Sequence, residues 1–513
     1  MTTLDNVNWK KLQNGSDIRG VALEGVPEEV MNLTPDVVKT LGNAFVQWIT
    51  QQTDKATSDI TIAIGRDSRL SGETLSQSAI EGIAIAGCQV YNFDLASTPA
   101  MFMSTVTPGY SCDGAIMLTA SHLPFNRNGL KFFTPNGGLG KPDITEILDL
   151  AATGKLMIDA DRGKVSSKDF ISIYAAKLVD TVRQGVNHPN NFEQPLTGLK
   201  VVVDAGNGAG GFYADKVLKP LGADTTGSQF LEPDGMFPNH VPNPENQEAM
   251  EAICQAVVNN QADFGIIFDT DVDRVAAVDY QGNELNRNRM IALISAIVLQ
   301  EQPGSTIVTD SITSDGLTQF IEDNLGGKHH RFKRGYKNVI NESIRLNESG
   351  EASWLAIETS GHGAMKENYF LDDGAYLATK LLAELAKAKL QAKQLTDLIA
   401  DLQEPLESEE FRLKIKTDDF KTYGNDVIKQ LQEFANTQAD WKIIPNNYEG
   451  VRISCKSPTE DGWFLLRLSL HDPVIPLNIE SNVAQGVATI ATRLLKFFQN
   501  FDALDLSALK TYL

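Results

Sequence analysis

Short apolar runs alternate along the chain with longer stretches of helical periodicity. The runs are rich in β-branched or aromatic residues and occupy residues 60–64, 115–118, 199–203, 264–268, 306–308 and 354–357. Most of them precede a segment with apolar residues at helical spacing, such as 73–86 or 375–390. This alternation is typical of α/β domains with largely parallel sheets.

Polar motifs follow these strand-like runs. They begin at Gly65, Thr119, Asp204, Asp269, Asp310 and Glu358, in the order of the six runs. Ligands of open α/β sheets bind beyond the carboxyl ends of the strands. The pattern therefore places the candidate chemistry where such folds have their active sites.

Polar segments mark the expected domain boundaries. A chain of 513 residues suggests about three or four domains. We expect breaks in the polar segment 152–167, at the turn 280–283 and in an acidic linker at 402–410. After this linker the pattern changes to that of an α+β domain.

Composition and charge exclude several classes of protein. A hydrophobic fraction of 42% with 22% charged residues is that of a globular chain. The net charge of −21 argues against nucleic acid and anionic membranes as partners, because both are polyanions. The longest apolar run, 291–299, is too short to span a bilayer and predicts a buried helix. Four scattered cysteines and no signal-like start predict a reduced, cytoplasmic protein.

The segment from Asp269 to Arg274 is the strongest local motif. Asp269, Asp271 and Asp273 alternate with other residues directly after an apolar run. Three carboxylates at this spacing can turn hard oxygen ligands toward one Mg²⁺ or Ca²⁺ ion. An EF-hand is excluded, because Arg274 holds its glycine position and Tyr280 its twelfth position. The alternative interpretation is a solvated acidic turn.

A second motif runs from Thr119 to Pro124. Ser121 follows an apolar run and is a candidate nucleophile, with Lys131 as a candidate acid or base. His122 does not make a serine–histidine pair by itself, because neighbours in sequence usually point apart. A turn or helix cap is the alternative interpretation.

Further clusters are less specific. Residues 206–211 match G-x-G-x-x-G, but Asp204 would repel a pyrophosphate, so a tight turn is the better interpretation. Arg66 and Arg69 suit either a phosphate or an interdomain ion pair. Residues 333–337 form a basic patch, and residues 358–362 combine carboxylate, hydroxyl and imidazole groups.

Taken together, these motifs resemble those of the α-D-phosphohexomutases, the phosphoglucomutase/phosphomannomutase superfamily. The matching segments, in family order, are 14–20, 65–69, 119–122, 128–131, 204–208, 234–240, 269–274 and 358–362. Among them, 119–122 resembles the family's phosphoserine loop, 269–274 its metal loop and 358–362 its sugar-binding loop.

The resemblance implies a fold of four domains around a deep cleft. Three α/β domains with mixed sheets would occupy residues 1–165, 166–285 and 286–402, and a C-terminal α+β domain residues 403–513. The domains would carry, in this order, the phosphoserine loop, the metal loop, the sugar-binding loop and a distal phosphate-binding loop.

The resemblance also implies roles for individual residues. The implied metal ligands are Ser121, Asp269, Asp271 and Asp273. The implied catalytic residues are Ser121, Lys131, Arg19, His122 and His362. The implied substrate-binding residues are Arg274, Lys337, Glu358, Ser360, Arg467, Ser469 and His471.

The implied activity is Mg²⁺-dependent phosphoryl transfer on α-D-hexose phosphates, that of an intramolecular phosphotransferase. Ser121 would pass its phosphoryl group to a sugar phosphate, and the resulting sugar bisphosphate would return its other phosphoryl group. A sugar bisphosphate would therefore also serve as activator or phosphoryl donor. We expect small hexose phosphates as partners and a monomer or small homo-oligomer.

One departure from the family leaves the activity open. The family's distal phosphate loop reads R-P-S-G-T-E-P, whereas residues 467–473 read R-L-S-L-H-D-P. Leu470 lacks the backbone freedom of the glycine, and His471 replaces the threonine. Such a loop could favour release of the bisphosphate, so a glucose-1,6-bisphosphate synthase is the alternative. A non-catalytic sugar-phosphate sensor and an unspecific Mg²⁺-dependent phosphatase are minor alternatives.

Overall fold

The computed structural model describes residue 4, residues 7–469 and residues 472–513. Its contacts divide the chain into two compact units. Unit 1 comprises Met1–Asn286 and Ser360–Asp397, and unit 2 comprises Arg287–Thr359 and Leu398–Leu513. His471, an expected substrate-binding residue, lies outside the described residues.

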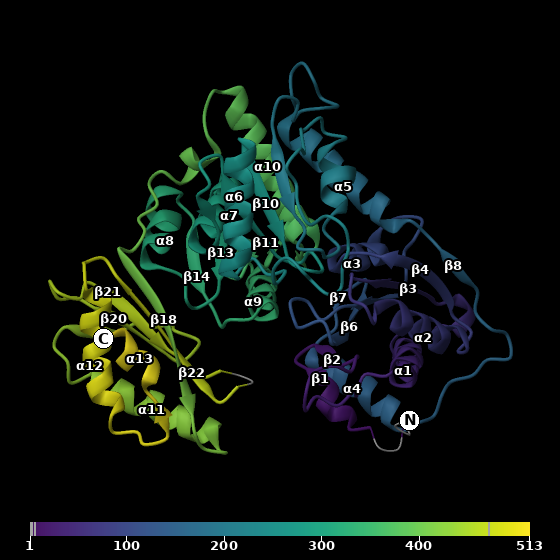
Figure 1. Ribbon diagram of the computed structural model, residues 1–513, viewed down its shortest axis with the longest axis horizontal. Helices are drawn as coiled ribbons and strands as arrows, with labels where there is room; N and C mark the ends of the chain where they lie inside the picture. Colours follow the sequence, from purple (N-terminus) through teal and green to yellow (C-terminus); the bar gives the residue numbers. More distant parts are fainter. Residues whose placement is uncertain (1–3, 5–6, 470–471) are drawn as a thin grey trace. The chain divides into compact units, whose positions relative to one another are not determined.

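Unit 1 begins with an eight-stranded sheet of order β1-β2-β6-β5-β3-β4-β8, with β7 paired to β6 (Figure 1). Its strands are β1 (Gln13–Asn14), β2 (Asp17–Val21), β3 (Thr61–Arg66), β4 (Gln89–Leu95), β5 (Gly114–Leu118), β6 (Arg127–Thr134), β7 (Gly137–Gly138) and β8 (Val165–Ser167). The associated helices are α1 (Pro35–Thr53), α2 (Gly72–Ala84), α3 (Thr98–Val106) and α4 (Lys141–Ala152). Strands β3, β4, β5 and β8 are parallel, and β2 and β6 run against their neighbours.

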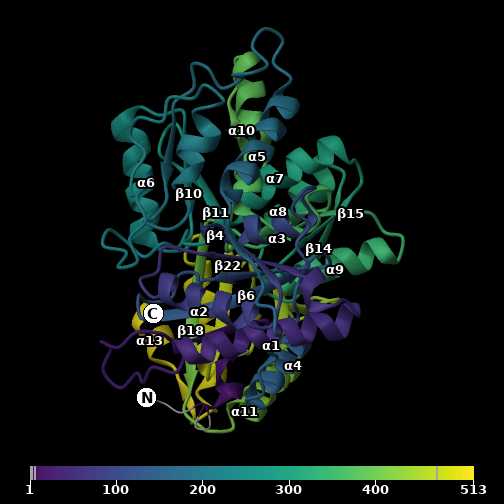
Figure 2. The same ribbon diagram turned by 90° about the vertical axis from the view of Figure 1, so that its right-hand side faces the viewer.

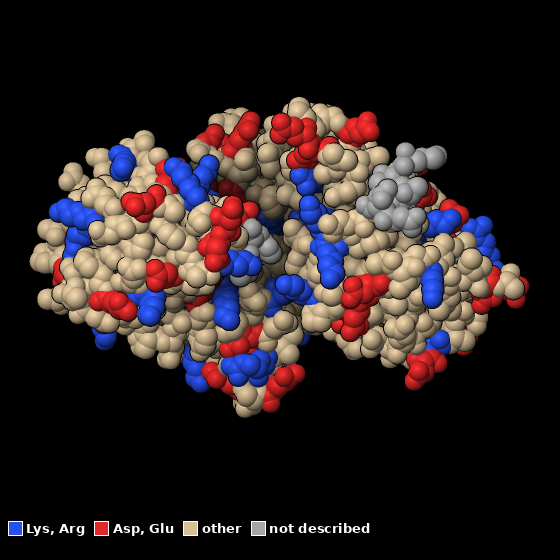
Figure 3. Space-filling view, turned by 90° about the horizontal axis from the view of Figure 1, so that it is seen from below, with Lys and Arg blue, Asp and Glu red and all other residues tan. Residues whose placement is uncertain are grey.

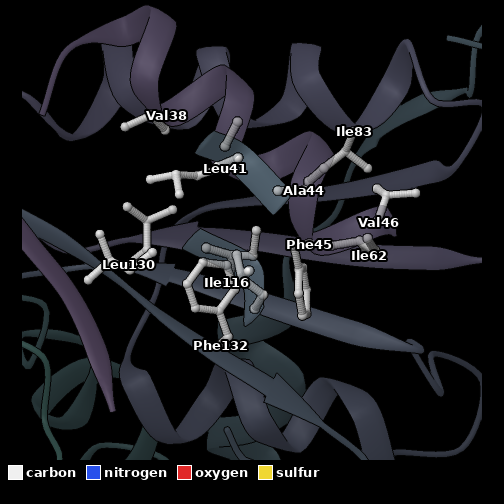
Figure 4. Packing of buried hydrophobic residues seen from close by; sticks show 14 of the residues in the cluster. Val38, Leu41, Ala44, Phe45, Val46, Ile62, Ile83, Ile116, Leu130 and Phe132 are labelled. Carbon is white, nitrogen blue, oxygen red and sulfur yellow. The ribbon is translucent and has the colours of Figure 1, made fainter. Parts of the chain in front are cut away.

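The core of this first layer lies between α1 and the sheet. Figure 4 shows Leu41 and Phe45 of α1 packed toward Ile116, Leu130 and Phe132 of the strands. All five side chains are buried, and the rings of Phe45 and Phe132 lie 4.9 Å apart. Burying side chains of this size stabilises the fold by about 1.5–3 kcal/mol each. The alternation of apolar runs and helices therefore predicts this layer correctly.

A second sheet in unit 1 has the order β12-β11-β10-β9. Its strands are β9 (Val201–Asp204), β10 (Phe264–Phe268), β11 (Val275–Asp279) and β12 (Glu284–Leu285). Helices α5 (Phe170–Val186), α6 (Gln247–Asn260) and α10 (Gly374–Leu390) and the hairpin of β16 (Gly363–Met365) and β17 (Leu371–Asp372) complete the unit. Helices α5 and α10 lie side by side in both ribbon views, although about 200 residues separate them in sequence (Figures 1 and 2).

The glycine-rich segment after β9 is a tight turn, as expected. Gly206 has a φ of +52°, and its N–H donates to Asp204 Oδ1 at 2.8 Å. The same carboxylate lies 3.1 Å from Nε2 of the buried His240. Asp204 is therefore occupied by protein groups at the mouth of the turn.

Unit 2 contains the parallel strands β14, β13 and β15. Its first half consists of α7 (Arg287–Glu301), β13 (Thr306–Thr309), α8 (Asp315–Gln319), β14 (Lys328–Arg331), α9 (Tyr336–Glu348) and β15 (Ser353–Ile357). Helix α7 is the buried helix expected from the apolar run at 291–299. In the described part of the chain, no helix combines the length and the apolarity needed to cross a bilayer.

The second half of unit 2 is an antiparallel sheet of order β19-β20-β21-β22-β18-β23 with helices against it. Its elements are β18 (Glu407–Ile415), α11 (Phe420–Ala435), β19 (Trp441–Ile443), β20 (Val451–Cys455), β21 (Gly462–Leu466), β22 (Val474–Ser481), α12 (Gly486–Phe498), β23 (Leu504–Asp505) and α13 (Ser507–Tyr512). This is the expected α+β domain, so the predicted fold class, three α/β domains followed by an α+β domain, is confirmed.

The acidic segment 407–410 is not the expected linker but the start of β18. Its residues pair with Asn478–Ser481 of β22 and continue into the buried Phe411 and Leu413. The Glu407 carboxylate also accepts hydrogen bonds from the N–H groups of Gln485 (2.6 Å) and Val487 (3.1 Å) at the start of α12. The acidic composition of 407–410 suggests a linker, but the segment is a strand. The negative charge of Glu407 is stabilised at the N-terminus of α12.

Candidate active site

The loop after β5 presents the expected nucleophile in an unusual backbone conformation. Ser121 has a φ of +50°, in the left-handed region that few non-glycine residues adopt. The Ser121 N–H donates to Thr119 Oγ1 at 2.9 Å. Local strain of this kind concentrates at functional sites.

Arg69 holds this loop in place. Its side chain is fully buried, and its guanidinium donates to the backbone carbonyl of Ser121 and to those of Leu123 (2.6 Å), Pro124 (2.8 Å) and Arg127 (2.9 Å). Asp67, 3.3 Å away, supplies the countercharge, and burial raises the pKa of this carboxyl to about 6.

The two arginines of the 65–69 motif therefore differ from expectation. Arg69 binds four carbonyls instead of a phosphate, and Arg66 pairs with the exposed Asp94 of the same domain at 2.7 Å. The positioning role of Arg69 was missed by the sequence reasoning. No signal in the spacing separates an arginine that binds phosphate from one that binds carbonyl groups.

The loop after β10 brings the three aspartates together. One oxygen from each of Asp269, Asp271 and Asp273 lies within 4.8 Å of the others, and all three residues are buried. Val272, between them, has a φ of +70°, a strained value for a β-branched residue. The local conformation, not the spacing alone, turns alternate side chains to one point.

The electrostatics of this cluster fit a bound cation. Burial and the negative charges of Asp273 and Asp271 raise the pKa of Asp269 well above its usual range. Lys131 Nζ lies 2.9 Å from Asp271 Oδ2 and 2.5 Å from Asp273 Oδ2, and Thr98 Oγ1 donates to Asp271 at 2.5 Å.

Two carboxylate oxygens nevertheless remain without a hydrogen bond. Within the described residues, Asp271 Oδ1 and Asp273 Oδ1 are buried and have no hydrogen-bond partner. Unsatisfied buried oxygens are rare in folded proteins, and a hard divalent cation satisfies them directly. The donor set therefore fits Mg²⁺.

Ser121 lies directly against this cluster. Its Oγ donates to Asp269 Oδ2 at 3.0 Å and accepts from Arg274 Nη2, also at 3.0 Å. Arg274 Nε is 3.3 Å from the same Asp269 oxygen. The structure thus places Arg274, expected on the substrate, beside the expected nucleophile and an oxygen of the aspartate cluster.

His122 also contacts this pair, although sequence neighbours were expected to diverge. Its Nδ1 lies 3.3 Å from Ser121 Oγ and 2.5 Å from Arg274 Nη2. Burial and the positive charge of Arg274 lower the pKa of His122 to about 3. His122 is therefore a neutral imidazole that accepts a hydrogen bond from Arg274.

His362 is the second imidazole of the site and, unlike His122, favours the protonated form. Its Nδ1 is 2.6 Å from Asp372 Oδ2 and 4.0 Å from Asp273 Oδ1. Burial opposes protonation, but the two carboxylates outweigh it and raise the pKa of His362 to about 9. Asp372 was not predicted, and the only sequence signal is its place before the helix cap Asp373.

Close backbone packing fixes His362 beside the metal loop. Gly361 has a φ of +92°, and a Cβ there would lie 2.6 Å from the carbonyl oxygen of Val275. The N–H of Val275 donates to the Gly361 carbonyl at 3.2 Å. Next to it, the buried Ser360 Oγ has no hydrogen-bond partner among the described residues.

Arg19 reaches the same region from β2. Its Nη1 donates to the carbonyl of Ala120 at 3.4 Å, and its Nη2 lies 3.1 Å from Asp17. Arg19 pairs in register with Gly129, whose neighbour on β6 two residues on is Lys131. Arg19, Lys131, Ser121, Arg274, His122 and His362 therefore converge within unit 1.

The remaining expected residues belong to unit 2. Glu358 accepts a hydrogen bond from the Gly335 N–H at 2.6 Å, and Lys337 lies in the first turn of α9. Arg467 and Ser469 follow β21, and Arg467 lies 3.7 Å from Glu449. Unit 2 thus has its own cluster of charged groups at the expected distal loop.

Comparisons with known proteins agree with this geometry. Residues 10–156, 176–282 and 286–405 match the family models described as phosphoglucomutase/phosphomannomutase, alpha/beta/alpha domains I, II and III. The chain is 32% identical over 452 residues to the phosphomannomutase/phosphoglucomutase of Pseudomonas putida, covering 87% of this chain and 89% of that protein. It is 29% identical over 479 residues to the phosphoglucomutase of Neisseria gonorrhoeae, covering 93% and 94% of the two chains.

A solved structure extends the likeness to the whole chain. The crystal structure of a phosphoglucomutase/phosphomannomutase family protein from Burkholderia thailandensis matches with a TM-score of 0.77 and 25% identity, over 98% of both chains. The fold and the serine–aspartate site define a phosphotransferase of the α-D-phosphohexomutase superfamily. Within it, the chain belongs to the phosphoglucomutase/phosphomannomutase family, whose members are intramolecular phosphotransferases.

Proposed function

We propose that this protein is a Mg²⁺-dependent phosphohexomutase that interconverts α-D-hexose phosphates through a phosphoserine and a sugar bisphosphate. One observation carries the proposal: Ser121 Oγ lies 3.0 Å from both Asp269 and Arg274, in a cluster where, among the described residues, Asp271 Oδ1 and Asp273 Oδ1 have no hydrogen-bond partner. The relatives are named phosphomannomutase and phosphoglucomutase, which supports glucose and mannose phosphates as the substrates to test first.

The chain's own residues supply positioning and charge. Asp269, Asp271 and Asp273 would hold Mg²⁺, whose chemistry is to neutralise charge on the transferring phosphoryl group. Arg274, whose Nη2 donates to Ser121 Oγ, stabilises negative charge as the bond between phosphorus and Oγ breaks. Arg19 is positioned on the Ala120 carbonyl for the same purpose.

Proton transfer falls to two groups. A sugar hydroxyl must lose its proton as its oxygen bonds to phosphorus, and Lys131, beside the metal loop, is a candidate acid or base. His362, whose Nδ1 lies 2.6 Å from Asp372 Oδ2, is the second candidate for proton exchange with the sugar. Glu358, Ser360 and, in unit 2, Lys337, Arg467 and the hydroxyl of Ser469 would bind the sugar and its second phosphate.

Replacement of the nucleophile tests the mechanism. In Ser121→Ala we expect loss of phosphoryl incorporation from labelled glucose 1,6-bisphosphate and a fall of at least about 10³-fold in interconversion of glucose 1-phosphate and glucose 6-phosphate. Ser408→Ala, at an exposed position of β18, is the matched control and should retain both. Turnover by Ser121→Ala at the rate of the control would exclude Ser121 as the phosphoryl carrier.

A bisphosphate synthase remains the second candidate, because the distal loop departs from the family sequence and its Arg467 faces a carboxylate. We infer that such a loop would favour release of the bisphosphate over its reorientation. Product analysis with glucose 1-phosphate, and with a second sugar bisphosphate as donor, separates the two. Accumulation of glucose 1,6-bisphosphate in step with donor loss identifies a synthase, whereas isomerised monophosphate alone identifies a mutase.

A further inference from the structure

The carboxylate of Glu449 lies among three residues of unit 2: Arg334, Arg467 and Ser311. We call these three residues the distal cluster. Glu449 Oε2 accepts hydrogen bonds from Ser311 Oγ at 2.6 Å and from the Arg334 N–H at 3.0 Å. Glu449 Oε1 lies 3.7 Å from Arg467 Nη1. A hydroxyl, a backbone N–H and a guanidinium are the groups that proteins use to bind phosphate, and here they surround a side chain of the protein.

The segment that carries Glu449 is held firmly. Gly450 has a φ of +59°, and a Cβ there would lie 2.0 Å from the Leu466 carbonyl oxygen and 2.7 Å from Arg467 Cα. On the other side of Glu449, the Tyr448 ring packs against the rings of Phe332 (4.9 Å) and His330 (5.3 Å). The contacts on both sides fix the carboxylate in the cluster.

Glu449 satisfies the cluster only in part. The Arg467 side chain is 10% exposed, and its buried Nε has no hydrogen-bond partner among the described residues. The contact of Arg467 Nη1 with Glu449 Oε1, at 3.7 Å, is longer than a hydrogen bond. A guanidinium can bind a phosphate through two parallel N–H groups, so Arg467 keeps capacity for a second anion.

We propose that Glu449 is an internal competitor for the second phosphate of the sugar, and so a residue that sets how tightly that phosphate is held. This inference rests on the proposed function. A phosphate entering the cluster meets the negative charge of Glu449, 3.7 Å from Arg467, and must displace it from Ser311 and the Arg334 N–H or share them. The carboxylate thereby weakens phosphate binding and speeds release of the phosphate. A sugar bisphosphate needs this release either to leave the protein or to reorient within it.

Equilibrium binding to the full-length protein tests this role. Glu449→Gln keeps the shape and a hydrogen-bond acceptor but removes the charge. With EDTA present to prevent turnover, we expect calorimetry to show a Kd for glucose 6-phosphate about five-fold lower than in the wild type. Asp323→Asn, the same charge change at an exposed position of unit 2, should leave the Kd unchanged, and uncharged glucose should not bind more tightly to either variant.

Unchanged or weaker binding of glucose 6-phosphate by a folded Glu449→Gln would overturn the proposal and assign Glu449 a structural role. If that variant does not fold, Glu449→Asp decides instead, since it keeps the charge but draws it away from Arg467 and should also bind more tightly than the wild type. Under turnover, the proposal predicts a lower KM for the monophosphate with a smaller change in kcat. Inorganic phosphate serves as a second probe, whose binding reports on Glu449 even if the protein interconverts no hexose phosphate.

Discussion

Single side chains in this protein do two kinds of work around Ser121. Asp269 and Arg274 contact its hydroxyl, whereas Arg69 donates hydrogen bonds to backbone carbonyls of the loop that carries Ser121. A buried guanidinium that satisfies several carbonyls at once cannot be replaced by a point charge, because each lost donor leaves a buried carbonyl unpaired. Asp269 and Arg274 therefore affect the Ser121 hydroxyl directly, whereas Arg69 positions the loop that carries it.

Arg69→Lys should therefore impair both the loop and the fold. A lysine cannot reach the carbonyls of Leu123, Pro124 and Arg127 together, so we expect a loss of about 2–4 kcal/mol in the free energy of unfolding and a fall in kcat. Denaturant titration and turnover assays measure the two effects. Arg66→Lys, whose partner Asp94 is exposed, is the control and should cost less than about 1 kcal/mol. Equal losses in the two variants would contradict the positioning role.

At the scale of elements, three strands of the last sheet hold a buried charge cluster. Arg452 of β20 lies 3.4 Å from the ring centroid of Trp463 on β21, and the indole N–H donates to Glu480 of β22 at 2.8 Å. Arg452 also donates to the carbonyls of Ser311 and Thr313, both at 3.0 Å. The cluster joins the two halves of unit 2.

The same cluster should make stability depend on pH. Burial raises the pKa of Glu480 from 4.5 to about 7, so the folded chain keeps a proton that the unfolded chain releases. Stability contributed by this proton is complete below about pH 4.5, falls as the pH rises to about 7, and is constant above, by at most roughly 3 kcal/mol. Thermal unfolding between pH 4.5 and 8 should show Glu480→Gln gaining on the wild type up to about pH 7.

An exposed acid provides the control for this pH dependence. Glu433→Gln, on the solvent side of α11, should run parallel to the wild type across the same range. If the difference between Glu480→Gln and the wild type does not change with pH, Glu480 is ionised in the folded protein. If Glu480→Gln instead loses stability relative to the wild type as the pH rises, a raised pKa of Glu480 is excluded.

Elements and motifs differ in how far the sequence predicts them. Apolar runs such as 264–268 became strands, because a buried strand needs a continuous apolar stretch. The start of β18 at Glu407 was missed, because residues 407–410 are half-buried or exposed and carry no apolar side chain, while Glu407 binds backbone N–H groups at the start of α12. Likewise, the spacing of Asp269, Asp271 and Asp273 predicts a metal site, but Asp372 comes to His362 only through tertiary packing.

At the scale of the whole molecule, each of the two units is built from two separate segments of the chain. Unit 1 takes up residues 360–397 after the chain has passed through part of unit 2, and with them His362 and Asp372. The serine–aspartate site thus assembles within unit 1 from segments far apart in the chain. On the face shown in Figure 3, basic side chains are interspersed with acidic ones, so the charge of −21 forms no single acidic patch there.

Because the aspartate cluster lies within unit 1, Mg²⁺ should stabilise this unit selectively. A ligand that binds only the folded state at 100 times its Kd adds about 2.7 kcal/mol of stability. Amide hydrogen exchange should therefore slow in residues 119–131 and 269–274 on addition of Mg²⁺, and the strands of unit 2, such as Val451–Cys455, should exchange as before. Asp271→Asn, which removes one of the converging carboxylates, should lose this protection while Asp94→Asn keeps it. Equal protection of both units, or protection that survives in Asp271→Asn, would mean that Mg²⁺ binds elsewhere. The result does not depend on turnover, so it tests the metal site separately from the proposed reaction.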